Sequence, residues 1–286
     1  MRPDPIEQPR KVAFVLSGGG SLGAIQVGML QALFEEGIQP DLLVGTSAGA
    51  VNAAWVAGCP GCDGVKELAG IWSGLRRNHI FPLNPWAGAR GLLGRTNHVI
   101  SNSGLRALLA RHIPYQRLEE ATIPIHVVAT DLKNGHAVVL SSGPTVPALL
   151  ASCAIPGVFP PVTVGRRELV DGGVADLTPI AAAIEQGATQ VYVLPIAYPW
   201  LRQERANAIG MALQALARVV EQRLHVAVAA YQHAADIRLL PSIDAPGVSP
   251  ADFSRTPELI SRAYRVTRRY LSAKPRELAA LPVAAA

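Results

Sequence analysis

The sequence is poor in several features that would each define a class of protein. Only 16% of its 286 residues are charged and only 5% are aromatic, whereas 49% are hydrophobic. A disordered chain would need more charge and fewer apolar residues, so a folded domain is expected. The net charge is only +5 and no block of five basic residues occurs. We therefore do not expect a surface for nucleic acid, which needs clustered basic and aromatic side chains.

Cysteines and long apolar runs are also scarce. The three cysteines are too few for a disulfide framework. No run approaches the roughly 18 apolar residues of a transmembrane helix, and the polar start of the chain does not resemble a signal peptide. We therefore expect a cytoplasmic protein, with peripheral contact at a membrane surface left open. Only four of the 26 basic residues are lysine, a bias that favours a bacterial source.

The first 58 residues alternate between strand and helix patterns. Residues 12–16 form a short apolar run that ends in a glycine turn, and a helical stripe follows over 22–36. A second short run, 42–44, breaks sharply into an alanine-rich helix that reaches about residue 57. This alternation predicts a mostly parallel sheet covered on both faces, which is a three-layer α/β/α fold.

A single domain is expected over residues 8–280, because no repeat or linker interrupts the chain. The motifs fall within 12–195, and the remainder, 200–280, is expected to be largely helical with an apolar stripe at helical spacing over 209–231. The proline- and glycine-rich stretch 76–104 predicts a long loop, whose part 80–93 is the candidate lipid-facing lid. Further strands are predicted at 125–129, 137–140, 168–170 and 190–195.

The strongest local signal is the Gly-Thr-Ser-Ala-Gly motif at residues 45–49. A serine on a sharp turn between a strand and a helix has its hydroxyl exposed at the carboxyl edge of the sheet. Gly45 and Gly49 suit such a turn because it leaves no room for Cβ atoms. The following helix begins at Ser47, where its dipole favours negative charge. The motif therefore predicts Ser47 as a nucleophile.

A glycine-rich loop, Gly18, Gly19, Gly20 and Ser21, precedes the first predicted helix. It fits a dinucleotide-binding loop, but no acidic residue follows the second strand to hold a ribose. It is also compatible with a plain turn, or with an oxyanion hole of backbone N–H groups. The serine turn one β-α unit later favours the oxyanion hole, and a nucleotide-binding protein stays as an alternative.

Five segments together resemble the patatin-like phospholipases, a family of serine lipid acyl hydrolases. They are GGGSLGAIQVGML (18–30), GTSAG (45–49), ATDLKNG (129–135), SCAIPGVFPPV (152–162) and DGG (171–173). They occur in the family's order, and the resemblance does not extend beyond about residue 195. The resemblance implies the fold predicted above and the hydrolysis of a carboxylic ester in a lipid through an acyl-enzyme.

The resemblance also implies the catalytic residues. Ser47 matches the family's nucleophile, and Asp171 of the Asp-Gly-Gly motif, with Gly172 and Gly173, matches its partner in a dyad. The loop from Gly18 to Ser21 matches the oxyanion hole. The lipid ester is then the substrate, with no metal, no calcium and no cofactor required. By itself Asp-Gly-Gly is also a common tight turn.

Two departures from the family pattern keep a non-catalytic patatin-like protein open as an alternative. Leu22 stands where the family loop usually has a basic residue, and the segment after Gly173 lacks the asparagine that usually precedes its proline. His225 and His233 follow Asp171, so the chain order allows a conventional triad. We expect neither to take part, because both lie on the predicted long helix.

The pair Cys59 and Cys62 has the spacing of a redox or zinc motif, Cys-Pro-Gly-Cys. A structural zinc site would need a second pair, and a thioredoxin-type motif would begin a helix. Because this pair follows the predicted nucleophile helix, we interpret it as a turn that ends that helix.

Overall fold

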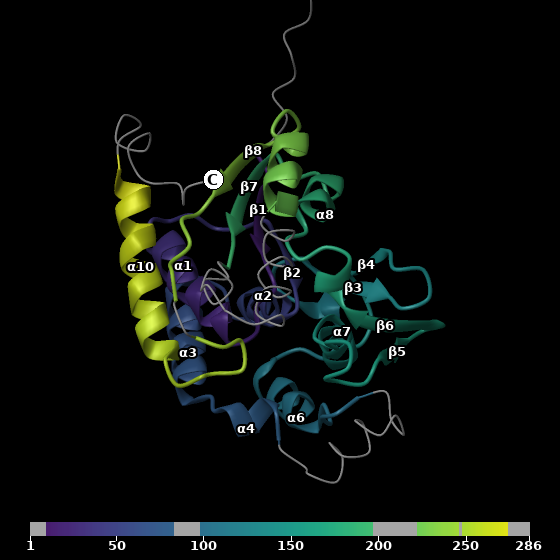
Figure 1. The fold of residues 1–286 in the computed structure, drawn as a ribbon. Coiled ribbons are helices and arrows are strands. Elements are labelled where there is room, and N and C mark those ends of the chain that lie inside the picture. Colours follow the sequence, from purple (N-terminus) through teal and green to yellow (C-terminus); the bar gives the residue numbers. More distant parts are fainter. Residues whose placement is uncertain (1–9, 83–97, 197–221, 246–247, 274–286) are drawn as a thin grey trace, which may run out of the picture.

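The computed structural model describes residues 10–82, 98–196, 222–245 and 248–273. They form one eight-stranded sheet with helices packed against it (Figure 1). The strand order is β5-β6-β3-β2-β1-β7-β8, and β4 pairs with β3 outside this path. The strands are β1 (Val12–Leu16), β2 (Leu42–Thr46), β3 (Ile125–Asp131), β4 (Ala137–Leu140), β5 (Val162–Val164), β6 (Arg167–Asp171), β7 (Gln190–Leu194) and β8 (Asp236–Leu239).

The middle of the sheet is parallel, as the sequence predicts. β1 pairs in parallel with β2 and β7, and the pairs β2–β3 and β7–β8 are also parallel. β4, β5 and β6 form antiparallel pairs at one side. Every residue of β1, β2, β3 and β7 is buried. Burial on both faces explains why their sequences are nearly continuous apolar runs.

Helices cover both faces of the sheet, which confirms the three-layer arrangement (Figure 1). Phe14 and Leu16 of β1 belong to the core with α1 and α2, whereas Ala13 and Val15 pack on the other face with α8 and residues 222–231. The helices are α1 (Ala24–Glu35), α2 (Ala48–Gly58), α3 (Gly61–Gly74), α4 (Arg77–Ile80), α6 (Ser103–His112), α7 (Thr145–Ser152), α8 (Ile180–Glu185) and α10 (Thr256–Ser272).

Several predicted elements agree with the structure and others do not. The predicted strand 12–16 is β1, and the predicted helix 22–36 corresponds to α1 after a short 3-10 turn. The loop predicted over 76–104 is wrong at α4 and at its last two residues, where α6 begins. Most of the proposed lid falls in 83–97, outside the described residues. Of the predicted stripe 209–231, only 222–231 is described, and it is helical.

The C-terminal part of the chain returns to the region that carries the motifs. α10 packs along α1, next to α3 (Figure 1). The loop before α10 passes over the glycine loop, where Ser21 N–H donates to the Pro250 carbonyl at 2.8 Å. In the part of the chain that the structure describes, no helix is long and apolar enough to cross a membrane.

Candidate active site

Ser47 lies on the sharp turn between β2 and α2. Its backbone angles are φ 54° and ψ −126°, and among the described residues it is the one non-glycine with positive φ. Such a conformation costs roughly 1–3 kcal/mol, and the surrounding structure must enforce it. A Cβ on Gly45 would come within 2.7 Å of the Ala50 backbone, and one on Gly49 within 2.3 Å of the Leu16 carbonyl oxygen. The turn can therefore pack here only with glycine on both sides.

The sheet brings Asp171 to this turn. β2 pairs with β3 as far as Thr46, which lies opposite Val128. The next residue of β3, Ala129, lies opposite Asp171 of β6. β4 occupies the other edge of β3, so β2 and β6 lie end to end along the same edge and point toward each other. Ser47, which follows β2, therefore meets Asp171, the last residue of β6.

A short hydrogen bond joins the two side chains. Ser47 Oγ donates to Asp171 Oδ2 at 2.7 Å, and Asp171 Oδ1 accepts from the Gly173 N–H at 2.7 Å. Both side chains are nearly buried, at 7% exposure each. A carboxylate that touches a serine hydroxyl within hydrogen-bond distance can accept its proton.

Burial changes the chemistry of Asp171. It raises the pKa of this carboxyl from 3.8 to about 6, although the hydrogen bonds from Ser47 and Gly173 act in the opposite direction. A carboxylate with a higher pKa is a stronger base. Asp171 is therefore a better proton acceptor than an exposed aspartate, and it is ionised at neutral pH.

A second serine, Ser152, which was not predicted from the sequence, links the turn at Ser47 to β3 by hydrogen bonds. Ser152, the last residue of α7, accepts the Ser47 N–H at 2.8 Å and donates to the Val128 carbonyl at 2.6 Å. It is fully buried. The signal in the sequence was its place at the start of the matched segment 152–162, but that match assigned it no role.

The glycine loop lies against Ser47, and a Cβ on Gly18 would come within 3.1 Å of Ser47 Cβ. The Gly18 N–H donates to the Leu177 carbonyl at 3.1 Å, and the Ser21 N–H to the Pro250 carbonyl. These two predicted oxyanion donors are thus already engaged. The N–H groups of Gly19 and Gly20 donate no hydrogen bond within the described parts of the chain, so they are the available pair.

The loop before α10 holds the glycine loop in place. Besides the backbone bond to Pro250, Ser21 Oγ donates to the Ser249 carbonyl at 3.0 Å. Gly20 has φ 60°, and a Cβ there would lie 2.5 Å from the Pro250 carbonyl oxygen. Pro250 lies beyond the part of the sequence that contains motifs. The sequence therefore gives no signal for this contact.

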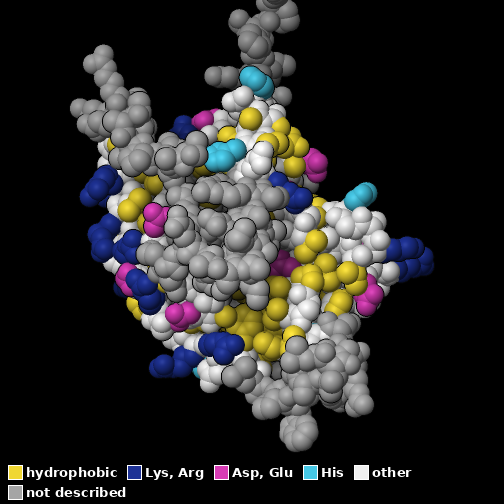
Figure 2. All heavy atoms as spheres, viewed as in Figure 1, with side chains coloured by type: hydrophobic (Ala, Val, Ile, Leu, Met, Phe, Trp, Pro, Cys, Tyr) yellow, Lys and Arg dark blue, Asp and Glu magenta, His cyan; other side chains and the backbone are white. Residues whose placement is uncertain are grey.

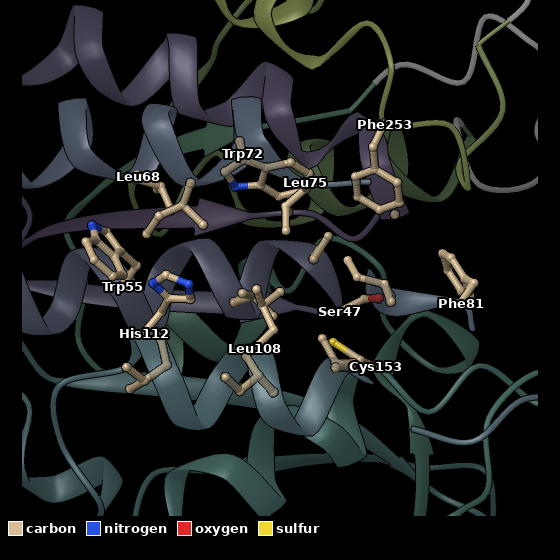
Figure 3. Close-up of a pocket in the computed structure, with 18 of the residues that line it drawn as sticks. Ser47, Trp55, Leu68, Trp72, Leu75, Phe81, Leu108, His112, Cys153 and Phe253 are labelled. Atoms are coloured by element: carbon tan, nitrogen blue, oxygen red, sulfur yellow. The ribbon is translucent and has the colours of Figure 1, made fainter. Parts of the chain in front are cut away.

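An apolar pocket opens beside Ser47 (Figure 3). Ser47 and Gly20 line it together with side chains of α2, α3 and α6, and Phe253 adds a wall from the loop before α10. The rings of Trp72 and Phe253 stack with centroids 6.1 Å apart. The pocket could hold the apolar part of a substrate whose reactive group lies at Ser47.

The histidines and cysteines lie mostly away from the dyad. His225 and His233 are exposed, and no described contact joins either to Ser47 or Asp171. His225 lies on the helical segment 222–231, but the prediction is wrong for His233, which lies in the turn after that segment. His112, which was not singled out from the sequence, lines the apolar pocket instead. Cys153 lies beside Ser47 in the same pocket, and burial raises the pKa of its thiol, which keeps it protonated (Figure 3).

The interpretation of Cys59 and Cys62 needs a correction. The pair not only ends α2 but also begins α3, where Pro60 is the N-cap residue and Cys62 lies in the first turn. The sequence concealed this because no helix was predicted over 61–74. Burial raises the pKa of the Cys59 thiol, which disfavours a reactive thiolate. Within the described ranges, no group of three or more His, Cys, Asp or Glu side chains is placed to hold a metal ion.

Leu22, the main departure from the family pattern, is fully buried in the core. Its side chain belongs to the packing of α1 and cannot contact a substrate head group. Val174, in the second departure, is 50% exposed just after Gly173.

Comparisons with known proteins identify a family and relatives of this chain. The family model described as "Patatin-like phospholipase" matches residues 14–184. An uncharacterized NTE family protein of Mycobacterium bovis is 35% identical over 172 residues, which are 60% of this chain and 45% of the relative. Patatin-like phospholipase domain-containing protein 7 of Rattus norvegicus is 26% identical over 187 residues, 65% of this chain and 13% of that protein.

The fold is shared with a solved structure. VipD from Legionella pneumophila has a TM-score of 0.50 and 17% sequence identity, covering 92% of this chain and 67% of that one. The chain spans less than half the length of the Mycobacterium relative that it matches. The match to VipD extends the likeness beyond the residues covered by the family model.

Proposed function

The chain belongs to the patatin-like phospholipase family, and we propose that it hydrolyses carboxylic esters of lipids through an acyl-enzyme formed on Ser47. The observation that carries this proposal is the 2.7 Å hydrogen bond from Ser47 Oγ to Asp171 Oδ2, at the mouth of an apolar pocket. A nucleophile, a base and a site for an acyl chain lie together there.

In the first half of the reaction, Ser47 Oγ attacks the ester carbonyl while Asp171 takes the hydroxyl proton. The tetrahedral intermediate collapses when the bond to the alcohol breaks, and Asp171 returns the proton to the departing oxygen. In the second half, Asp171 takes a proton from water, the hydroxide attacks the acyl-enzyme, and the fatty acid leaves as Ser47 recovers its proton.

The negative charge that develops on the carbonyl oxygen needs hydrogen-bond donors. The free N–H groups of Gly19 and Gly20 are the proposed donors, and the N-terminus of α2 adds a favourable dipole. No step of this mechanism requires calcium. We expect equal rates in EDTA and in calcium, and a rate that depends on calcium would contradict this part of the proposal.

We also propose that the enzyme contacts lipid surfaces peripherally. Four large hydrophobic side chains are exposed in the described ranges, and three of them lie around Asp171. Val174 lies three residues after Asp171. Ile155 follows Ala154, whose carbonyl accepts the Asp171 N–H, and the Leu132 N–H donates to the Glu168 carbonyl of β6. Figure 2 shows apolar side chains gathered on the face that carries α7 and β6. A lipid surface is a suitable partner for such a face.

An alkyl fluorophosphonate tests the assignment, because it bonds covalently to an activated serine. We expect mass spectrometry to find the label on the peptide that contains Ser47, and Ser47→Ala to abolish both labelling and ester hydrolysis. Ser73→Ala is the matched control, since Ser73 lies on the exposed surface of α3. An unlabelled wild-type protein that is folded by circular dichroism would favour a non-catalytic family member instead.

A further inference from the structure

The apolar pocket is a channel that follows one face of α2. Ser47 at the start of this helix lines it, and so do Val51 and Trp55 on the next two turns. Positions separated by four residues share one face of a helix. Figure 3 shows Trp55 and His112 at one end of the pocket, and Ser47 toward the other end, where Phe81 also lies. The channel thus leads from the nucleophile along the helix axis.

The walls offer almost nothing polar to a ligand between these two ends. α3 and α6 supply the facing side chains, which include Leu68, Leu105 and Leu108. The indole N–H of Trp55 donates to the Gly64 carbonyl and that of Trp72 to the Asn52 side chain, so both are engaged outside the channel. The lining favours an aliphatic chain.

Trp55 and His112 line the pocket at the side away from Ser47 (Figure 3). The Trp55 indole and the His112 imidazole lie with ring centroids 6.4 Å apart, and the Trp55 side chain is buried. From Ser47 to Trp55 the helix advances about 12 Å, at 1.5 Å for each of eight residues. An extended chain advances roughly 1.2 Å per bond, so this length holds about ten chain atoms.

We propose that the channel along α2 limits the length of the acyl chain to about ten carbons. In this proposal Trp55 and His112 form the end of the channel. This inference rests on the proposed function. Val51 lies half-way, about 6 Å from Ser47 along the helix axis. Its half-buried side chain lines the channel and also packs against the core. A larger residue at this position would therefore project into the channel.

The first test is the rate with nitrophenyl esters of 4 to 16 carbons. Each methylene that enters the channel should raise kcat/KM up to about fourfold. We expect kcat/KM to rise by about 100-fold from the butanoyl to the decanoyl ester, and to stay level or fall beyond 12 carbons. A rise that continues to 16 carbons would overturn the proposed length limit.

Two variants move the limit in opposite directions. Val51→Phe should lower the ratio of decanoyl to butanoyl kcat/KM by about 100-fold, because about five chain atoms then fit. Trp55→Leu should move the optimum to longer chains. Val226→Phe makes the same substitution as the first variant at an exposed site outside the channel, and it should leave the profile unchanged. If Trp55→Leu does not fold, Val51→Phe still decides the question.

A binding measurement separates this inference from the proposed reaction. In Ser47→Ala protein, neutral alkyl methyl ketones of 6 to 16 carbons can be titrated by tryptophan fluorescence, since Trp55 and Trp72 line the channel. Affinity should rise until about ten carbons and then stop, and Val51→Phe should shorten that limit. If this binding pattern occurs but the wild-type protein hydrolyses no ester, the inferred channel is correct and the proposed reaction is wrong. If Val51→Phe changes nothing, the inference is wrong.

Discussion

The two sides of Ser47 differ in their chemistry and in their origin along the chain. On one side are polar groups from three short motifs, which are the glycine loop, the serine turn and Asp171 with Gly173. On the other side, side chains from α2, α3, α6 and the loop before α10 form an apolar channel. The polar side would carry out the reaction on any ester, and the apolar side would choose among them. Substitutions on the two sides should therefore have different signatures.

The largest effect is expected on the polar side, from Asp171→Asn. An amide cannot accept the Ser47 proton, so kcat/KM should fall by about 10³–10⁴. The fall should be similar for short and long esters, because no channel residue changes. A loss confined to long esters would mean that Asp171 positions substrate and is not the base.

The pH dependence of the wild-type enzyme follows from the same group. The proposed mechanism needs Asp171 ionised, and burial raises its pKa to about 6, so kcat/KM should rise through pH 6 and level off above 7. Stability should show the opposite trend. Because the folded pKa lies above the unfolded one, stability falls as pH rises from about 4 to 6, by up to about 3 kcal/mol. Asp171→Asn should lack this fall in urea unfolding.

The next effect is expected from Gly20→Ala. A Cβ at this position would lie 2.5 Å from the Pro250 carbonyl oxygen, and φ there is 60°. The loop would have to move, and loss of one oxyanion donor costs about 10²–10³ in rate. Gly135→Ala is the matched control, since Gly135 has φ 74° with open space around it. Equal losses in both variants would indicate general strain instead of a misplaced donor.

The same contrast explains how much could be predicted from the sequence. The polar side consists of short motifs whose residue types are dictated by local geometry, so Ser47, Asp171 and the loop were visible as patterns. The apolar side depends on contacts between distant segments, and Phe253 or His112 is by itself an ordinary core or surface residue. α3 and α6 were not predicted at all, so the channel between them could not be.

The sheet topology was only partly visible for a related reason. Short apolar runs indicated buried strands, and the parallel middle of the sheet followed from the β-α-β alternation. That β6 continues the line of β2 beside β3 depends on pairing register, which no local pattern specifies. The meeting of Ser47 and Asp171 was therefore an expectation from family resemblance, not from periodicity.

A smaller effect is expected at the proposed lipid surface. Leu132→Ser should reduce binding to vesicles of phosphatidylcholine and phosphatidylglycerol by about fivefold in a flotation assay, because an exposed leucine would no longer be buried in lipid. Val226→Ser is the control, since Val226 is also exposed but lies on the helical segment 222–231. If both variants lose binding equally, the contact surface is not the one around Asp171.

The smallest effect is expected from the histidines after the motif region. An ordinary serine esterase uses imidazole because its pKa lies near the working pH. In the proposed mechanism the base is Asp171, whose pKa is raised by burial to about 6. His225 and His233 are exposed and belong to the segment that packs on the other face of the sheet, with α8.

We therefore expect His225→Ala and His233→Ala, singly and together, to change kcat/KM less than about twofold for every ester. The acid limb of the pH profile should keep its midpoint near 6 in the double variant, because it reports Asp171. This midpoint separates the two bases, since removal of a catalytic imidazole would abolish the limb together with the activity. A folded double variant without activity would replace the dyad by a triad, and the polar side of the site would then extend beyond the three motifs.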